Sequence, residues 1–243
     1  MTARPNSRCF GLIGGLGTPS TVYYYQMLIK SFEARGAPAR FFVANADFDR
    51  VLQLITENDA PALAGYFASL IGSLKRAGAE FVALSAVMPH LCMPELEKCS
   101  PLPVLDIVEV LKRHLSEQGL SRIALLGTRI TMETKLFERL AEYDLVDLPT
   151  SDLQEVQRIY RSIQVHGSAT ADDTLYLRAL GKCLHESKGA QIIAVAGTDL
   201  STVFHGGSEP FPLFDCASAH IEAIVEQATS STTHVSNTTN LAR

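Results

Sequence analysis

The sequence lacks the features of several common classes of protein. It has no run of basic residues, and its 21 Lys and Arg residues against 26 Asp and Glu residues give a formal net charge of −5. This balance disfavours nucleic acid and anionic membrane surfaces as partners. The longest apolar stretches, such as residues 81–88 and 191–197, are far too short to span a bilayer. We therefore expect neither nucleic-acid nor membrane partners.

Signals for secretion, disulfides and metals are lacking too. Residues 1–8 contain no apolar signal-peptide region. The five cysteines are scattered, odd in number and without CxxC spacing, and the histidines show no metal-ligand spacing. This pattern is typical of reduced thiols in the cytoplasm and predicts neither a disulfide framework nor a zinc site. We expect a cytoplasmic protein without a bound metal.

The sequence does contain a regular alternation of strand and helix signals. Apolar residues make up 47% and charged residues 19% of its 243 residues, so the chain can bury a sizeable core. Apolar runs predict strands at residues 9–13, 40–45, 79–85 and 103–106, and apolar spacing predicts helices at residues 20–34 and 61–78 and one ending at Leu115. Strands that alternate with amphipathic helices predict βαβ units and a mainly parallel sheet.

The same order of elements then recurs, which predicts an internal duplication. The recurring strands are at residues 122–128, 189–194 and 212–215, with a helix at residues 175–188. We predict an α/β fold of two pseudo-symmetric, Rossmann-like halves with parallel sheets, and a ligand site in the cleft between them. The predicted boundaries are residues 8–115 plus 215–228 for the first half, 116–214 for the second, and 229–243 for a disordered tail.

A glycine-rich loop, residues 14–17, lies between the first strand and the first helix. Its backbone N–H groups could hold an anion, with Gly15, Thr18 and Ser20 as candidate contacts. A tight turn with a helix cap at Ser20 or Thr21 is an equally good interpretation, because the loop matches neither the Walker pattern nor the dinucleotide-binding pattern. The loop alone therefore does not choose between the two.

The counterpart of this loop in the second half is residues 127–133. Thr128 and Thr131 are candidate ligand contacts there, and Thr131 can also cap a helix. Arg129 could pair with a carboxylate, although a solvated surface charge is the better interpretation of Arg129 alone.

Two short segments, residues 84–90 and 194–200, occupy matching places after buried strands, where parallel sheets usually present their chemistry. The candidate ligand contacts in them are Ala86, Val87, Met88, Gly197 and Thr198. The candidate acid/base residues in or near them are His90, Asp199, Cys92 and Cys216. Each also has a structural interpretation: a buried histidine, a turn cap or an inert buried thiol.

Several motifs together resemble those of the aspartate/glutamate racemase family, over about residues 9–228. The motifs are Gly11-Leu12-Ile13-Gly14-Gly15-Leu16-Gly17, Ser20-Thr21-Val22-Tyr23-Tyr24-Tyr25, Asp47-Phe48, Arg76-Ala77-Gly78-Ala79, Leu126-Gly127-Thr128-Arg129-Ile130-Thr131-Met132-Glu133, Gly197-Thr198-Asp199-Leu200, and Phe214-Asp215 with His220. The resemblance implies two similar α/β halves, a homodimer and inversion of acidic amino acids without pyridoxal phosphate or another cofactor. Two facing thiols, or a threonine and a thiol, exchange the α-proton in such proteins.

The sequence differs from the family's usual motifs at the positions that would carry this chemistry. Ala86-Val87-Met88-Pro89-His90 stands where the family usually has Cys-Asn-Thr-x-His or Thr-Asn-Thr-x-His, and Ala196-Gly197-Thr198-Asp199 stands in place of Gly-Cys-Thr-Glu. Because Ala86 and Gly197 carry no titratable group, the two-base mechanism cannot run at these positions. The retained Thr128, Arg129, Thr131 and Thr198 still suit an anionic ligand.

Three functions follow from this pattern. The first is a divergent, cofactor-independent enzyme of isomerase or lyase type that acts on a small carboxylate or amino-acid-like ligand with one carboxylate and a less polar remainder. The second is a catalytically inactive relative that binds such a ligand. The third is an amino-acid racemase with relocated acid/base residues, which would need Cys92 and Cys216 to face each other.

Overall fold

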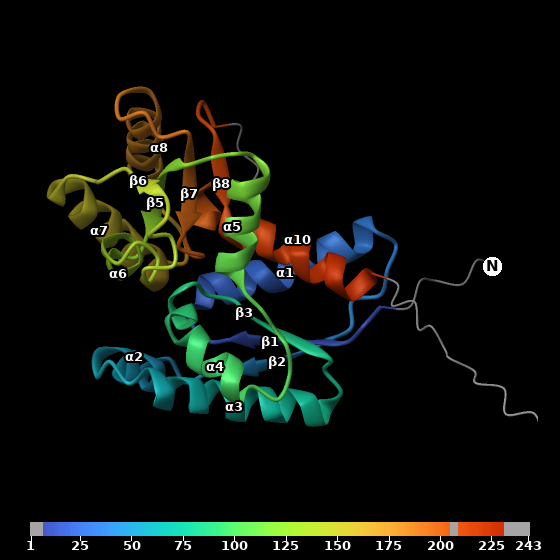
Figure 1. Cartoon of the computed structure of the whole chain (residues 1–243). Helices are drawn as coiled ribbons and strands as arrows, with labels where there is room; N and C mark the ends of the chain where they lie inside the picture. The colour runs from blue at the N-terminus through green and yellow to red at the C-terminus, as the bar shows by residue number, and fades with distance from the viewer. Residues whose placement is uncertain (1–6, 205–208, 231–243) are drawn as a thin grey trace, which may run out of the picture.

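The structure, a computed structural model, describes residues 7–204 and 209–230, which form two parallel sheets surrounded by helices (Figure 1). The first sheet has the strand order β2-β1-β3-β4 and the second has the order β6-β5-β7-β8. The strands are β1 (Phe10–Gly14), β2 (Phe41–Asn45), β3 (Phe81–Leu84), β4 (Val104–Leu105), β5 (Arg122–Gly127), β6 (Asp144–Leu145), β7 (Ile192–Ala196) and β8 (Leu213–Asp215). The two orders are equivalent, so the predicted fold of two pseudo-symmetric parallel α/β halves is confirmed.

Helices connect the strands and cover the sheets. They are α1 (Thr18–Ala34), α2 (Phe48–Thr56), α3 (Ala60–Ala77), the 3-10 helix η1 (Met88–Cys92), α4 (Met93–Cys99), α5 (Ile107–Glu117), α6 (Arg129–Glu133), α7 (Thr150–His166), α8 (Ala171–Glu186), α9 (Ser201–Phe204) and α10 (Cys216–Thr229). None of the helices in the described part of the chain is both long and apolar enough to cross a membrane.

The central strands are apolar throughout because helices cover both faces of each sheet. Every residue of β1, β3 and β7 is buried. On the first sheet, Phe10 and Leu12 pack toward α1 and α10, whereas Ile13 and Val82 pack toward α2, α3 and α4. The carboxyl ends of β3 and β7 are thereby held in fixed positions.

Helix α10 links the two halves. It follows the last strand of the second sheet, yet it packs against α1 and α5 and contributes to the same core cluster as Phe10. Figure 1 shows α10 next to α1, beside the first sheet. The predicted domain boundaries remain a prediction. Of the predicted tail at residues 229–243, only Thr229 and Ser230 are among the described residues.

The turn after α6 has an unusual backbone. Lys135, Leu136, Phe137 and Glu138 have φ angles of 51°, 56°, 61° and 62°, in the left-handed region that disfavours side chains with a β-carbon. Leu136 is buried in the core of the second half, and Arg139, the next residue after the turn, reaches Asp106 at the start of α5.

Candidate functional site

The ends of β3 and β7 lie at matching places in the two sheets. After β3 come Ser85, Ala86 and Val87, which are buried, and then η1, which begins at Met88. After β7 comes a turn in which the N–H of Leu200 donates to the carbonyl of Gly197. Neither Ala86 nor Gly197 has a side chain that can take up or release a proton.

The ring of Tyr160, from α7, fills the space above Gly197. A β-carbon at Gly197 would lie 2.7 Å from Cε2 of Tyr160 and 2.9 Å from Cα of Gly127. Burial raises the pKa of the Tyr160 hydroxyl well above its ordinary value, so this hydroxyl is a neutral group at physiological pH. The second strand end is therefore occupied by an aromatic side chain from another helix.

The carboxylate of Asp199 joins the two halves next to Tyr160. Its Oδ1 accepts the backbone N–H of Ser20, at the start of α1, over 2.9 Å, and its Oδ2 accepts from Nε2 of Gln164 over 3.2 Å. Burial raises the pKa of Asp199, while hydrogen bonds from Ser20, Tyr160 and Gln164 partly oppose the shift. Asp199 thus caps α1 from the opposite half, which leaves room only for glycine at residue 17, where a β-carbon would lie 2.9 Å from Oδ2 of Asp199.

The contacts of the glycine-rich loop favour the tight-turn interpretation. The N–H of Gly15 donates to Oγ1 of Thr21 over 3.1 Å, and Gly15 has a φ of 79°. The N–H of Ser20 is taken by Asp199. Thr18 lies instead in the wall of a cavity of about 570 Å³ between α1 and the end of α7.

A second cavity, of about 720 Å³, lies between α2 of the first half and α6 and α7 of the second. Its wall includes Met88, Thr128 and Arg129 from the sequence-based prediction, together with Tyr160 and Gln164. Its other wall residues include two further arginines, Arg158 and Arg161, and the apolar side chains of Phe48, Leu52, Ile55 and Ile130. No aspartate or glutamate among the described residues lines it. We call it the arginine cavity.

The threonines of the α6 loop support the helix that borders this cavity. Oγ1 of Thr128 accepts the N–H of Thr131 over 3.2 Å, so Thr128 caps α6, and it lies 2.6 Å from Oγ1 of Thr131. Thr131 is buried within the helix and does not itself act as the cap. Arg129 is mostly exposed and pairs with Glu133 over 2.7 Å. Thr198 is buried in the turn after β7.

The two predicted cysteines are not brought together. Cys92 lies in the core of the first half, where its Sγ donates to the carbonyl of Pro89 over 3.2 Å and burial raises its pKa to about 12. Cys216 is buried in the core beside α5, and burial raises its thiol pKa well above the ordinary value. Neither environment favours a thiolate.

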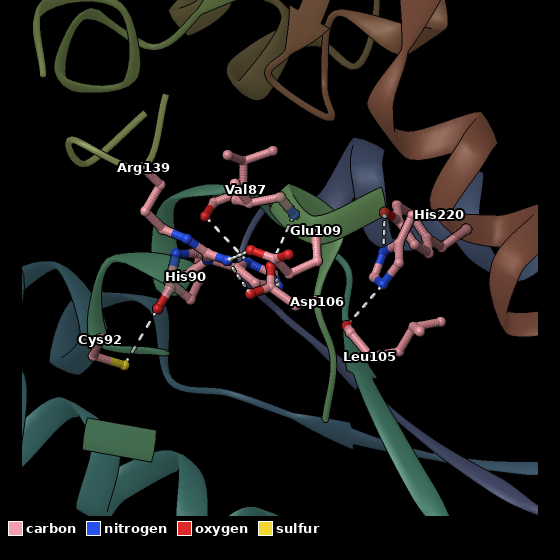
Figure 2. Close-up of polar contacts among 11 residues, drawn as sticks. Val87, His90, Cys92, Leu105, Asp106, Glu109, Arg139 and His220 are labelled. Atoms are coloured by element: carbon pink, nitrogen blue, oxygen red, sulfur yellow. Dashed lines mark hydrogen bonds and ion pairs between the residues drawn. The ribbon is translucent and has the colours of Figure 1, made fainter. Parts of the chain in front are cut away.

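His90 is fully buried in η1, behind the strand end (Figure 2). Its Nδ1 lies 3.2 Å from the carbonyl of Val87, and its Nε2 lies 3.9 Å from Oδ1 of Asp106. Burial lowers the pKa of His90, with Asp106 opposing the shift, so the imidazole is neutral at physiological pH. His90 is absent from the described wall of the arginine cavity.

His220, at the other predicted histidine position, is also a buried structural group. Its Nδ1 lies 2.9 Å from the hydroxyl of Tyr24, and its Nε2 lies 2.9 Å from the carbonyl of Leu105. Burial lowers its pKa to about 3. Because the carbonyl can only accept, Nε2 carries the proton and Nδ1 accepts from the tyrosine.

Sequence reasoning did not identify Tyr160, Gln164 or Arg161. All three lie in α7, between residues 150 and 166, where no helix was predicted. Arg161 and Gln164 are three positions apart and face the same cavity, as that spacing on a helix allows. Only the tertiary placement of α7 against the turn after β7 shows their relation to Gly197.

The chain is similar to one protein family and to several solved structures. The family described as Asp/Glu/Hydantoin racemase matches residues 13–224. A structure from Yersinia pestis, described as a candidate Asp/Glu racemase, is 26% identical, with 92% of this chain and 100% of that chain covered and a TM-score of 0.79. An aspartate racemase homologue from Pyrococcus horikoshii is 22% identical, with 92% and 100% covered and a TM-score of 0.79. Glutamate racemase from Thermus thermophilus, in complex with β-chloro-D-alanine, is 17% identical, with 91% and 80% covered and a TM-score of 0.57.

Proposed function

Because the chain belongs to the Asp/Glu/hydantoin racemase family, we propose that it binds a small carboxylate or amino-acid-like ligand between its halves and acts on it without a pair of thiols. The observation that carries the proposal is the packing of Tyr160 over Gly197, 2.7 Å from where a β-carbon would be. With Ala86 at the matching strand end, neither position 86 nor position 197 can supply a proton-transfer group. Family membership supports the kind of ligand, and this packing argues against the family's two-thiol chemistry here.

The arginine cavity supports recognition of a carboxylate. Arg129 pairs with Glu133, and Arg158 pairs with Glu155 and Asp173. Arg161 has no ion-pair partner among the described residues. A guanidinium without an acidic partner, in a wall without acidic side chains, favours an anionic ligand and can hold a carboxylate through two parallel hydrogen bonds.

The rest of the cavity wall suits a ligand with a single carboxylate. The apolar side chains of Phe48 and Leu52 of α2 and of Met88 of η1 line it together with the arginines of α6 and α7. Burial of apolar surface contributes about 25 cal/mol per Å², whereas a second carboxylate placed against these side chains would lose hydration without a partner. We therefore propose a ligand with one carboxylate and an apolar remainder.

Asp199 is the acid/base group of this proposal. Asp199 is itself 1% exposed and is not among the wall residues of the arginine cavity, but its partners Tyr160 and Gln164 line that wall and connect the carboxylate to the cavity. Burial raises the pKa of Asp199, which brings proton exchange closer to neutral pH. One such group suits isomerisation or a lyase-type step that needs neither metal nor organic cofactor. His90, Cys92 and Cys216 are buried too, but in the described part of the chain none of them lines this cavity or hydrogen-bonds to a side chain that does. The environments of the two thiols give no support to a racemase with relocated cysteines.

A second candidate is a protein that binds the ligand without chemistry. It is favoured by the hydrogen bonds of Asp199, since both carboxylate oxygens already accept from Ser20 or Gln164. In this second candidate, the carboxylate has a structural role and holds the two halves together.

Ligand binding can be tested by thermal unfolding in the presence of aspartate, glutamate, phenylalanine and phenylacetate. A ligand at 100 times its Kd stabilises the folded state by about 2.7 kcal/mol. We expect a monocarboxylate with an apolar remainder to raise the Tm, whereas stabilisation by aspartate or glutamate alone would contradict the proposed ligand class. Arg161→Ala should weaken binding by tenfold or more, and Arg113→Ala, an exposed arginine of α5 outside the cavity wall, should not.

Chemistry can be tested by α-proton exchange in heavy water, followed by NMR with each stabilising amino acid. Exchange that Asp199→Asn abolishes, with ligand stabilisation retained, would support the enzyme. Stabilisation without any exchange or turnover would support the binding protein instead.

The proposal also includes a cellular compartment and an oligomeric state. The five cysteines are unpaired, as is typical of a reducing compartment, and we propose a cytoplasmic homodimer.

A further inference from the structure

A cluster of buried polar side chains lies behind the first strand end and joins the two halves (Figure 2). His90 comes from η1, Asp106 is the N-cap of α5, and Arg139 follows the left-handed turn of the second half. The side chains of His90 and Asp106 are 0% and 6% exposed, and that of Arg139 is 19% exposed. The side chains of His90 and Asp106, and the Nη1 atom of Arg139, are shielded from bulk water, so their polar atoms need hydrogen-bond partners inside the molecule.

The known contacts assign the direction of each hydrogen bond. Nδ1 of His90 faces the carbonyl of Val87, so the neutral ring carries its proton on Nδ1 and Nε2 is an acceptor. Nη2 of Arg139 donates to Oε1 of Glu109 over 2.8 Å and lies 2.6 Å from Oδ2 of Asp106. Oδ1 of Asp106 accepts the N–H of Val108 over 2.8 Å.

Three buried atoms of this cluster make no hydrogen bond within the described residues: Nε2 of His90, Oδ2 of Asp106 and Nη1 of Arg139. Oδ2 of Asp106 forms an ion pair with Arg139 but still has a lone pair that can accept a hydrogen bond. Nη1 of Arg139 still has N–H groups that can donate one. The set therefore offers two acceptors and one donor. Nε2 of His90 and Oδ1 of Asp106 are 3.9 Å apart, too far for a direct hydrogen bond.

We propose that these three atoms bind one internal water molecule. The water donates one hydrogen to Nε2 of His90 and the other to Oδ2 of Asp106, and it accepts from Nη1 of Arg139. Three hydrogen bonds to otherwise unsatisfied groups are typical of a buried water. A water molecule offers two donors and an acceptor on one small centre, which complements the two acceptors and one donor of this cluster.

This water gives His90 a positioning role. It connects η1, which follows Ala86, to the start of α5 and to Arg139 of the second half. The imidazole thereby fixes the segment that borders the arginine cavity, and its only free nitrogen is engaged away from that cavity.

A crystal structure of the full chain, at a resolution that shows ordered water, tests the site directly. We expect density for one water within hydrogen-bond distance of all three atoms. Direct contact between Nε2 of His90 and Asp106, or the absence of a water there, would overturn the proposal.

The tautomer of His90 provides an independent test in solution by ¹⁵N NMR of the imidazoles. We expect His90 to carry its proton on Nδ1 and His220, the internal reference, to carry it on Nε2. A proton on Nε2 of His90 would require the nitrogen to donate, which contradicts the proposed water.

A conservative variant tests the donor. Arg139→Lys keeps the charge beside Asp106 but removes Nη1, so its crystals should lack the water. Arg35→Lys, at the exposed ion pair with Glu222, should retain it. If Arg139→Lys does not fold, the wild-type crystal and the NMR tautomer still decide the question.

Discussion

At the scale of single residues, Gly197 and Tyr160 determine what the second strand end can do. Gly197 has no side chain, and the ring of Tyr160 from α7 occupies the space where one would lie. The ring fills this space, so the absence of a side chain at position 197 does not leave a hole. A residue restored there would have to displace Tyr160 and approach the backbone of Gly127.

Gly197→Ala should therefore destabilise the protein by about 1–3 kcal/mol, the usual cost of overpacking a core. The added methyl would lie 2.7 Å from the ring of Tyr160 and 2.9 Å from Cα of Gly127. Gly65→Ala, on an exposed face of α3 with nothing within 4 Å of the new β-carbon, is the matched control. It should stabilise by about 0.5–1 kcal/mol because alanine favours the helix. Urea unfolding of both variants measures the difference, and equal effects would show that Tyr160 does not fill the site.

Asp199 makes the stability of the protein depend on pH in a particular direction. Burial raises its folded-state pKa above the ordinary 3.8. At pH values between the unfolded-state pKa and the raised folded-state pKa, the folded state binds more protons than the unfolded state. The contribution of Asp199 to stability therefore falls as the pH rises through this range. Asp199→Asn removes this dependence.

The free energy of unfolding of Asp199→Asn, minus that of the wild type, should therefore increase between pH 4 and pH 7. Urea unfolding at both pH values gives the difference, which is independent of any constant loss from replacing an oxygen by an amide. A difference that decreases with pH would mean that the hydrogen bonds from Ser20 and Gln164 outweigh burial and lower the pKa.

At the scale of elements, strands were easier to predict than the helices of the site. The apolar runs of β1, β3, β5 and β7 are buried on both faces, so composition alone indicates them. Helix α7 has buried apolar residues at helical spacing, at Val156, Ile159, Tyr160 and Ile163, so this pattern could have indicated the helix although no helix was predicted there. The position of Asp199 after β7 was predicted, whereas its contact with Ser20 depends on how the halves meet.

The left-handed turn after α6 could not be predicted either, because its four residues have side chains. Lys135 and Glu138 are exposed there, with φ angles of 51° and 62°. Leu136 and Leu140 are both buried, and their packing holds the turn in place. The left-handed conformation costs about 1–2 kcal/mol for each residue with a β-carbon.

Lys135→Gly should consequently stabilise the protein, by up to about 1 kcal/mol once the greater freedom of glycine in the unfolded chain is included. Lys30→Gly, in the interior of α1, is the matched control and should destabilise by about 1 kcal/mol. Thermal or urea unfolding distinguishes the two signs. A loss of stability in both variants would contradict the left-handed backbone at Lys135.

At the scale of the whole molecule, contacts that differ in chemistry hold the two halves together. Asp199 caps α1 across the boundary, α10 packs against α1, and Arg139 reaches Asp106 and Glu109. The first and third contacts lie beside the two strand ends. Because the wall of the arginine cavity takes residues from both halves, we expect the proposed ligand binding to depend on how firmly the halves are held.

The outer edge of the first sheet is the surface that we expect to form the homodimer. β2 is an edge strand, and Phe42 and Val43 are 44% and 46% exposed. Val22 and Tyr25 of α1 are 48% and 52% exposed, and Tyr25 packs on Phe41 of β2. An exposed apolar edge strand readily pairs with another strand, and a twofold axis there would join two first sheets.

Phe42→Lys should convert such a dimer into monomers, because each copy of the interface would bury two like charges close to the axis. Leu175→Lys is the matched control, since Leu175 is 65% exposed on α8, in the other half. Sedimentation equilibrium over a range of concentrations measures the mass of each variant. A wild type that is monomeric throughout, or a Phe42→Lys variant that keeps the dimer mass, would contradict this surface, whereas dissociation by Phe42→Lys alone would place the interface at β2.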